Sequence, residues 1–262
     1  MKVGFIGAGN MGGALATAAA KSKACLFLSD RDAEKAKALA KKLKCETATA
    51  EAIVKDCDYI FLGVKPQVLG ALLQEIAPAL NARSQKPVLV SMAAGVQMQD
   101  ILSKAAAPLI RIMPNIPVSA GAGMILYDIS ASVTDEQEQA FLQILEKAGQ
   151  LCRLEEKLID AGSAVSGCGP AFVSLFVEAM ADGGVACGLP RDKAMAFALQ
   201  TLLGTASLLQ KTGQHPGELK DAVCSPGGST IAGVEALEQG GLRASVMDAV
   251  RAAFERTKEL GK

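Results

Sequence analysis

The amino-terminal run Lys2–Gly12 reads KVGFIGAGNMG and indicates the fold class more strongly than any other segment. Its first five residues, KVGFI, have the apolar character of a short buried strand. Gly7, Gly9 and Gly12 follow, and the next residues, ALATAAAK, favour a helix. A G-x-G-x-x-G turn placed between a strand and a helix predicts the start of a dinucleotide-binding βαβ unit.

Each glycine of this turn has a physical reason. Gly7 allows the tight turn, Gly9 lets the backbone approach a pyrophosphate, and Gly12 lets the helix pack closely on the strand. Backbone N–H groups of the loop, Ala8 included, and the positive end of the helix then hold the phosphates. The alternative is a glycine-rich turn that binds nothing.

Strands and helices continue to alternate after this unit. The expected strands are Cys25–Ser29, Asp58–Val64, Pro87–Met92, Leu109–Met113 and Met124–Tyr127, and the expected helices are Asp32–Leu43, Gln67–Leu80, Val96–Ala106 and Asp135–Ala148. This alternation predicts an α/β fold in which residues 1–157 form a Rossmann domain with a doubly wound parallel sheet.

The pattern changes near residues 158–166, and we expect no strand from Gly169 onward. Residues 158–262 are therefore predicted to form an all-helical domain. Its helices are apolar on several faces, which places them in a core or against another subunit. The expected helices are Pro170–Ala186, Asp192–Lys211, Pro216–Val223, Thr230–Gln239 and Leu242–Leu260.

Composition excludes several classes of function. Lys+Arg and Asp+Glu are both 27, and only 4% of residues are aromatic, so we expect no nucleic-acid binding. No stretch has 18 uninterrupted apolar residues, so we expect no membrane span. The seven cysteines form no C-x-x-C pair and His215 is the single histidine, which predicts no metal site and a reducing, cytoplasmic location.

The residues at the end of the second strand should determine whether NAD or NADP is preferred. Asp30 lies 21 residues after Gly9, near the position of a ribose-binding acid, which favours NAD. Ser29 and Arg31 flank it, and a hydroxyl beside a guanidinium suits the 2′-phosphate of NADP. We expect NADPH to be preferred, with NAD as the alternative.

A second glycine-rich loop, Ser225–Thr230, reads SPGGST before a helix. Ser229 is expected as the N-cap and Thr230 as an early helical residue. Gly227 and Gly228 would expose successive backbone amides, which suits a small anion such as a carboxylate. An ordinary capped helix after a glycine turn is the alternative interpretation.

Motifs along the whole chain together resemble the pyrroline-5-carboxylate reductase family. They are FIGAGNMG (5–12), GVKP (63–66), SMAAGV (91–96), RIMPNIP (111–117), SGCGPAF (166–172), ADGGVACGLPR (181–191) and HPGELKDAVCSPGGSTIAG (215–233). The resemblance implies hydride transfer from NAD(P)H to the cyclic imine 1-pyrroline-5-carboxylate, giving L-proline in the last step of proline biosynthesis. It also implies a helical domain that interlocks into a homodimer, and dimers that assemble into decamers.

The resemblance also assigns roles to single residues. Ser225, Gly227, Gly228, Ser229 and Thr230 are expected to hold the substrate, and Thr230 is the candidate to hydrogen-bond the ring nitrogen and relay a proton. Further contacts with the dinucleotide are expected from Asn10, Met11, Val64, Lys65, Pro66, Ala93, Ala94, Gly95, Met113, Pro114 and Asn115.

Two other functions compete with this one. A hydroxyacid dehydrogenase also joins a Rossmann domain to helices, but it needs a helical lysine facing its substrate, and residues 166–180 contain none. A non-catalytic dinucleotide sensor would keep the first glycine loop but has no need of the second.

Overall fold

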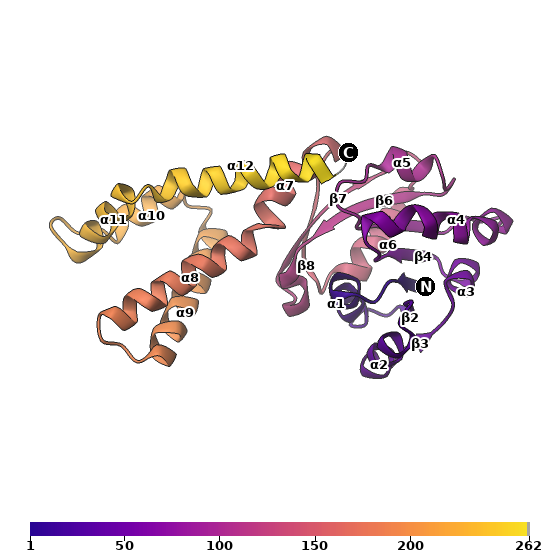
Figure 1. The fold of residues 1–262 in the computed structure, drawn as a ribbon, viewed down its shortest axis with the longest axis horizontal. Coiled ribbons are helices and arrows are strands. Elements are labelled where there is room, and N and C mark those ends of the chain that lie inside the picture. Colours follow the sequence, from indigo (N-terminus) through magenta and orange to yellow (C-terminus); the bar gives the residue numbers. More distant parts are fainter. Residues whose placement is uncertain (261–262) are drawn as a thin grey trace. The chain divides into compact units, whose positions relative to one another are not determined.

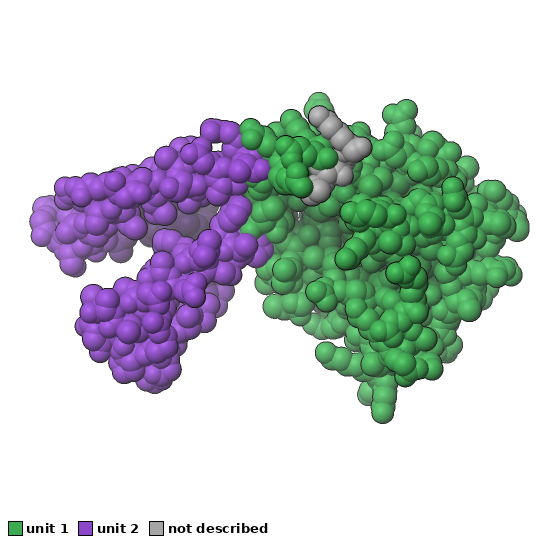
Figure 2. Space-filling view, in the orientation of Figure 1, with its two compact units in different colours: residues 1–168, 253–262 green, residues 169–252 purple. Residues whose placement is uncertain are grey.

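A computed structural model describes residues 1–260. The chain divides into two compact units, coloured separately in Figure 2. One comprises Met1–Cys168 and the chain from Ala253 onward, and the other comprises Gly169–Ala252. The division follows Cys168, whereas the sequence pattern predicts a boundary between residues 157 and 158. The difference is one helix, α7 (Glu156–Ser166), which packs on the sheet.

The first unit contains an eight-stranded sheet in the order β3-β2-β1-β4-β5-β6-β7-β8 (Figure 1). The strand order reverses beside β1, because β2 and β4 pair with it on opposite sides. The strands are β1 (Lys2–Ile6), β2 (Cys25–Ser29), β3 (Glu46–Thr47), β4 (Tyr59–Leu62), β5 (Val88–Ser91), β6 (Leu109–Pro114), β7 (Gly123–Ile129) and β8 (Gly149–Arg153).

The prediction of an all-parallel sheet is wrong, because β7 pairs antiparallel with β6. The eight residues between them hold only a short 3-10 helix, η1 (Ile116–Ala120). A parallel return needs a longer crossover, usually through an α-helix. The last strand, β8, follows the helix α6 (Asp135–Leu145) and pairs parallel with β7, so these two strands run opposite to the other six.

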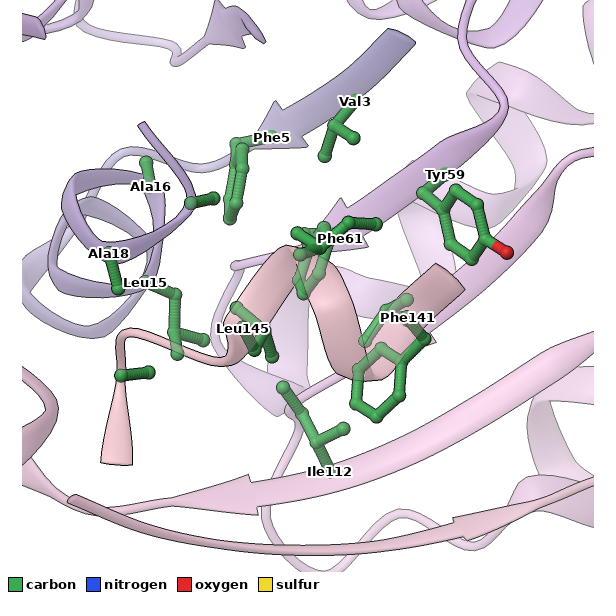
Figure 3. Packing of buried hydrophobic residues seen from close by; sticks show 14 of the residues in the cluster. Val3, Phe5, Leu15, Ala16, Ala18, Tyr59, Phe61, Ile112, Phe141 and Leu145 are labelled. Carbon is green, nitrogen blue, oxygen red and sulfur yellow. The ribbon is translucent and has the colours of Figure 1, made fainter. Parts of the chain in front are cut away.

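Helices cover both faces of this sheet. Alternate residues of each strand point to opposite faces, so Phe5 and Phe61 lie in one core while Ile6 and Leu62 lie in the other. The first core, seen in Figure 3, packs against α1 (Asn10–Ala19), α2 (Ala33–Leu43) and α6. The second packs against α3 (Ala50–Asp56), α4 (Pro66–Ala82) and α5 (Met98–Leu102).

The second unit is helical throughout its described residues, as predicted. Its buried core is small and consists of Val177, Ala181, Ala194 and Ala198. These residues lie on the paired helices α8 (Gly169–Ala186) and α9 (Arg191–Thr212). Three further helices follow, α10 (Pro216–Ala222), α11 (Ser229–Gln239) and α12 (Leu242–Leu260), whose end belongs to the first unit.

Several short elements were not predicted from the sequence. They are β3, β8, α3 and α7, and the expected helix Val96–Ala106 is only Met98–Leu102. The run Glu156–Ala186 is long and apolar enough to cross a membrane by composition, with a mean hydropathy of 1.5 over 18 residues. Length and composition alone do not distinguish such a span from a helix covered by protein.

Candidate functional site

The predicted dinucleotide residues follow the carboxyl ends of five adjacent strands. Register places Ile6 beside both Ser29 and Leu62, Leu62 beside Ser91, and Ser91 beside Arg111. The loops after β1, β2, β4, β5 and β6 therefore leave from one edge of the sheet. The reversal of strand order beside β1 lies on this edge, which is where open α/β sheets bind their ligands.

The glycine loop after β1 depends on close backbone contact. Gly7 has a φ of +103°, and its N–H donates to the carbonyl oxygen of Ser29 at 2.7 Å. A Cβ atom at Gly12 would overlap the carbonyl oxygen of Gly7. A Cβ atom at Gly63, just after β4, would lie 2.5 Å from the same oxygen. Gly12 and Gly63 therefore allow the loop to pack against α1 and β4.

Gly9 differs from its neighbours because a Cβ atom there would meet no atom within 4 Å. It is the N-cap of α1, where no side chain caps the helix and the first turn carries no acid. The first-turn N–H groups and the positive helix end are therefore left to an external anion. Asn10, exposed, and Met11, half-buried, begin the helix beside this space. These features fit a dinucleotide pyrophosphate.

Asp30 is turned toward this loop. Its Oδ2 accepts the N–H of Ala8 at 2.7 Å, and its Oδ1 accepts the N–H of Asp32 at 3.0 Å. Both carboxylate oxygens are thus engaged by backbone donors. Ser29 is half-buried and Arg31 is exposed at the same strand end.

The remaining predicted cofactor residues lie along the same edge. Val64, Lys65 and Pro66 join β4 to α4, with Lys65 as the exposed N-cap. Ala93, Ala94 and Gly95 form the turn after β5, where Gly95 has a φ of +75°. Met113 and Pro114 end β6, and Asn115 follows them buried. Pairing between neighbouring strands brings these segments together.

Sequence reasoning missed one charged group near this edge. Arg111 lies in the middle of β6, is only 1% exposed, and is bonded to Glu156 and Asp160 of α7. The signal was available, because an arginine interrupts the apolar strand LIRIMP. A charge that is buried in this way requires ionic partners.

The predicted substrate residues lie in the second unit. Gly227 has a φ of +67°, and the N–H of Gly228 donates to the carbonyl oxygen of Ser225 at 3.0 Å. The expectation that Ser229 caps the helix is wrong, because Gly228 is the N-cap and Ser229 is the first helical residue of α11. No side chain caps this end, and Thr230 lies exposed in the first turn.

The dinucleotide and substrate residues thus fall in different units. The seven cysteines are all free. Burial raises the pKa of the Cys57 thiol to about 12, which leaves it protonated at neutral pH. Residues 1–260 contain no group of three or more His, Cys, Asp or Glu side chains placed to hold a metal ion.

Comparisons with known proteins cover both units. Residues 156–260 match a family model described as pyrroline-5-carboxylate reductase dimerisation, and residues 2–95 match one described as NADP oxidoreductase coenzyme F420-dependent. The chain is 40% identical to a pyrroline-5-carboxylate reductase of Methanosarcina acetivorans, over 100% of this chain and 98% of the relative. The corresponding enzyme of Glycine max is also 40% identical, over 98% and 95% of the two chains.

A solved structure is similar along the same length. Plasmodium falciparum pyrroline carboxylate reductase with NADP bound superposes with a TM-score of 0.87. It is 31% identical, and the match covers 100% of this chain and 98% of that one. Together, these full-length likenesses show that the chain belongs to the pyrroline-5-carboxylate reductase family.

Proposed function

We propose that this protein reduces the C=N bond of 1-pyrroline-5-carboxylate to give L-proline, the last step of proline biosynthesis. The observation that carries the proposal is its full-length likeness to reductases of that name, which spans both glycine loops of this chain. A nicotinamide dinucleotide supplies the hydride when bound, and the protein supplies binding and orientation. The uncapped end of α1 and the open space at Gly9 fit the pyrophosphate.

We propose NADPH as the preferred dinucleotide. An acid that selects NAD turns its carboxylate to the ribose hydroxyls, whereas both oxygens of Asp30 accept backbone N–H groups. Arg31, exposed at the same strand end, can pair with a 2′-phosphate. Arg31→Ala should raise KM for NADPH about tenfold, as expected for a lost charged hydrogen bond. KM for NADH should stay unchanged, and an equal loss with both dinucleotides would contradict this role.

The second glycine loop is proposed to hold the substrate. The amides at Gly227, Gly228 and Ser229, at the uncapped start of α11, suit the carboxylate of the substrate. The Thr230 hydroxyl lies in the same turn and is proposed to hydrogen-bond the ring nitrogen, whose protonation helps it accept hydride. Thr230→Ala should lower kcat about tenfold through the loss of one aligned hydrogen bond, and Thr230→Ser should restore much of it.

We propose a homodimer as the working assembly, and decamers as the form into which these dimers assemble. The second unit exposes large apolar side chains such as Leu175 and Leu203, 67% and 62% exposed. Surfaces of this kind on a helical unit fit burial against a second copy. The free cysteines fit a reducing compartment such as the cytoplasm.

The test is steady-state oxidation of NADPH and of NADH by the purified protein with pyrroline-5-carboxylate, while proline formation is followed. We expect proline with both dinucleotides and a lower KM for NADPH. Binding without turnover would instead support a dinucleotide sensor. Dinucleotide reduction with hydroxyacids, in the absence of imine turnover, would support a dehydrogenase.

A further inference from the structure

Two side chains fasten α7 to the sheet at opposite ends of the helix. Arg111 reaches its first turns, and Asn115 reaches its last turn. Between them, α7 lies so close to β7 that a Cβ atom at Gly162 would lie 2.5 Å from the side chain of Leu126. The helix therefore has little freedom to shift on this face of the sheet.

The first attachment is ionic. Arg111 Nη1 lies 3.2 Å from Glu156 Oε1, and Arg111 Nη2 lies 2.7 Å from Asp160 Oδ1. The Nε atom of Arg111 is buried without a hydrogen-bond partner. A buried ion pair is weak evidence for a gain in stability, since apolar side chains of similar volume often serve as well. The rigid, planar guanidinium of Arg111 instead fixes the orientation of α7. It pairs with two carboxylates one helical turn apart, so α7 cannot rotate about its axis without losing one of the pairs.

Glu156 extends this attachment to the loop after β5. Its Oε1 also accepts the N–H of Met98 at 2.6 Å, and its own N–H donates to Asp128 Oδ2 at 2.7 Å. Met98 begins α5, three residues after Gly95 of the turn that is expected beside the nicotinamide. One carboxylate thus links α7, β6 and the start of α5.

The second attachment uses both polar atoms of the Asn115 amide. Its Oδ1 accepts the N–H of Met124 at 2.9 Å, and its Nδ2 donates to the carbonyl oxygen of Ser166 at 2.9 Å. Asn115 is 8% exposed and follows β6 directly. Ser166 is the last residue of α7, and the helical unit begins at Gly169. Asn115 therefore fixes the carboxyl end of α7 within the first unit.

We propose that Arg111 and Asn115 are positioning residues for hydride transfer. They hold α7, within the first unit, at a fixed place relative to the strand ends that carry the nicotinamide loops. This inference rests on the proposed reductase activity. Both polar atoms of Asn115 bond to the protein backbone and are not left for the dinucleotide. Because a small displacement of reacting groups lowers the rate while binding is retained, the loss of Arg111 or Asn115 should reduce kcat and leave dinucleotide affinity unchanged.

The main test compares Asn115→Ala with Ser130→Ala in the full-length protein. Ser130 is a matched control, because its buried Oγ accepts the N–H of Leu109 at 3.0 Å at the opposite end of β6. We expect both variants to lose similar amounts of Tm. Asn115→Ala should lower kcat about 10- to 100-fold while the Kd for NADPH, measured by fluorescence, stays within about twofold. Ser130→Ala should keep the wild-type kcat.

A second readout does not depend on turnover. Hydrogen exchange of the amides at residues 166–169 should become faster in Asn115→Ala and stay unchanged in Ser130→Ala. Arg111→Met should lower kcat with dinucleotide affinity retained, and Arg111→Lys should recover part of it. If Arg111→Met does not fold, the Asn115 variant still decides.

The outcomes distinguish the positioning role of Arg111 and Asn115 from the proposed reductase activity. Wild-type kcat in Asn115→Ala, together with unchanged exchange at residues 166–169, overturns the positioning role and leaves the reductase proposal intact. An inactive wild-type protein overturns the reductase proposal and, with it, the catalytic part of this inference. Exchange that speeds up equally in both variants shows general loosening and also overturns the positioning role.

Discussion

The two units of this protein bury their apolar side chains to very different extents. In the first, two cores enclose the sheet, and Phe5 and Phe61 are stacked with ring centroids 4.5 Å apart. In the second, the buried cluster of the described residues consists of one valine and three alanines. Phe197 and Leu203 lie on the same helix as two of those alanines, yet they are 56% and 62% exposed.

This difference separates two ways of completing a core. The sheet unit covers both of its faces with its own helices, so its stability should not depend on protein concentration. The helical unit can bury its large side chains only against further protein. A fold completed by association has an apparent stability that rises with concentration. The family match to a dimerisation region over residues 156–260 agrees with this reading of the exposed surface.

The largest expected effect comes from placing a charge on this exposed apolar surface. Leu203→Glu would bury a carboxylate without a partner in the assembly, at a cost of about 3–5 kcal/mol. Dimer affinity should fall about 100- to 5,000-fold. Sedimentation analysis should show monomers, and reductase turnover should fall with the dimer. Gln210→Glu, which adds the same charge to a polar, exposed position of α9, should leave the assembly unchanged.

An unaltered oligomeric mass for Leu203→Glu would contradict the conclusion that the helical unit completes its core by association. It would mean that this part of α9 stays in solvent when the chain assembles. The wild-type mass, whether of a dimer or a decamer, fixes the reference for this measurement. The Tm of the helical unit should rise with wild-type concentration and fall in the variant.

A smaller effect is expected inside the sheet unit, where two glycines of one loop should behave differently. A Cβ atom at Gly12 would overlap the Gly7 carbonyl oxygen, so Gly12→Ala should cost about 1–3 kcal/mol of unfolding free energy. Gly9→Ala meets open space and should keep the wild-type Tm, but it should weaken NADPH binding about tenfold or more. Urea unfolding and fluorescence titration measure the two quantities.

Measuring the stability of Gly12→Ala at two protein concentrations makes this test more specific. The loss of stability in Gly12→Ala should be the same at low and high concentration, since the loop lies in a unit that covers its own core. Unchanged NADPH affinity in a folded Gly9→Ala variant would show that the backbone there does not approach the dinucleotide.

Patterns with local causes could be predicted from the sequence. The strand, glycine turn and helix at residues 2–19 follow from short-range chemistry, and so does the helical character after Gly169. The antiparallel strand β7 was missed because its direction depends on the short segment that connects it to β6. The partners of Arg111 were missed because Glu156 and Asp160 lie 45 and 49 residues away in the chain.

Asp30 and Asn115 show the same limit within the candidate site. The sequence predicts Asp30 as a cofactor contact from its position at a strand end, and the family resemblance implies the same role for Asn115. It cannot predict that the polar atoms of each side chain bond to the backbone of the protein itself, because those donors and acceptors come from other loops.

The smallest expected effect is a difference in alkaline stability between the units. Both tyrosines of the chain, Tyr59 and Tyr127, lie in the sheet unit. The hydroxyl of Tyr127 donates to Glu138 Oε1 at 2.8 Å, and burial together with this carboxylate raises its pKa from about 10 to about 12. The pKa of Tyr59 is raised to about 12 as well, mainly by burial.

A raised pKa means that the folded unit binds these phenol protons more tightly than the unfolded chain does. Their contribution is therefore fully present below about pH 10 and is lost as the pH rises toward 12. Urea unfolding of the sheet unit between pH 9 and about 11.5 should show this loss, and Tyr127→Phe should make it shallower. Tyr59→Phe should do the same, and the double variant should keep only the loss that comes from the buried Cys57 thiol, whose pKa is also raised to about 12. An unchanged slope in the double variant would place the alkaline loss outside the tyrosines and remove this distinction between the two units.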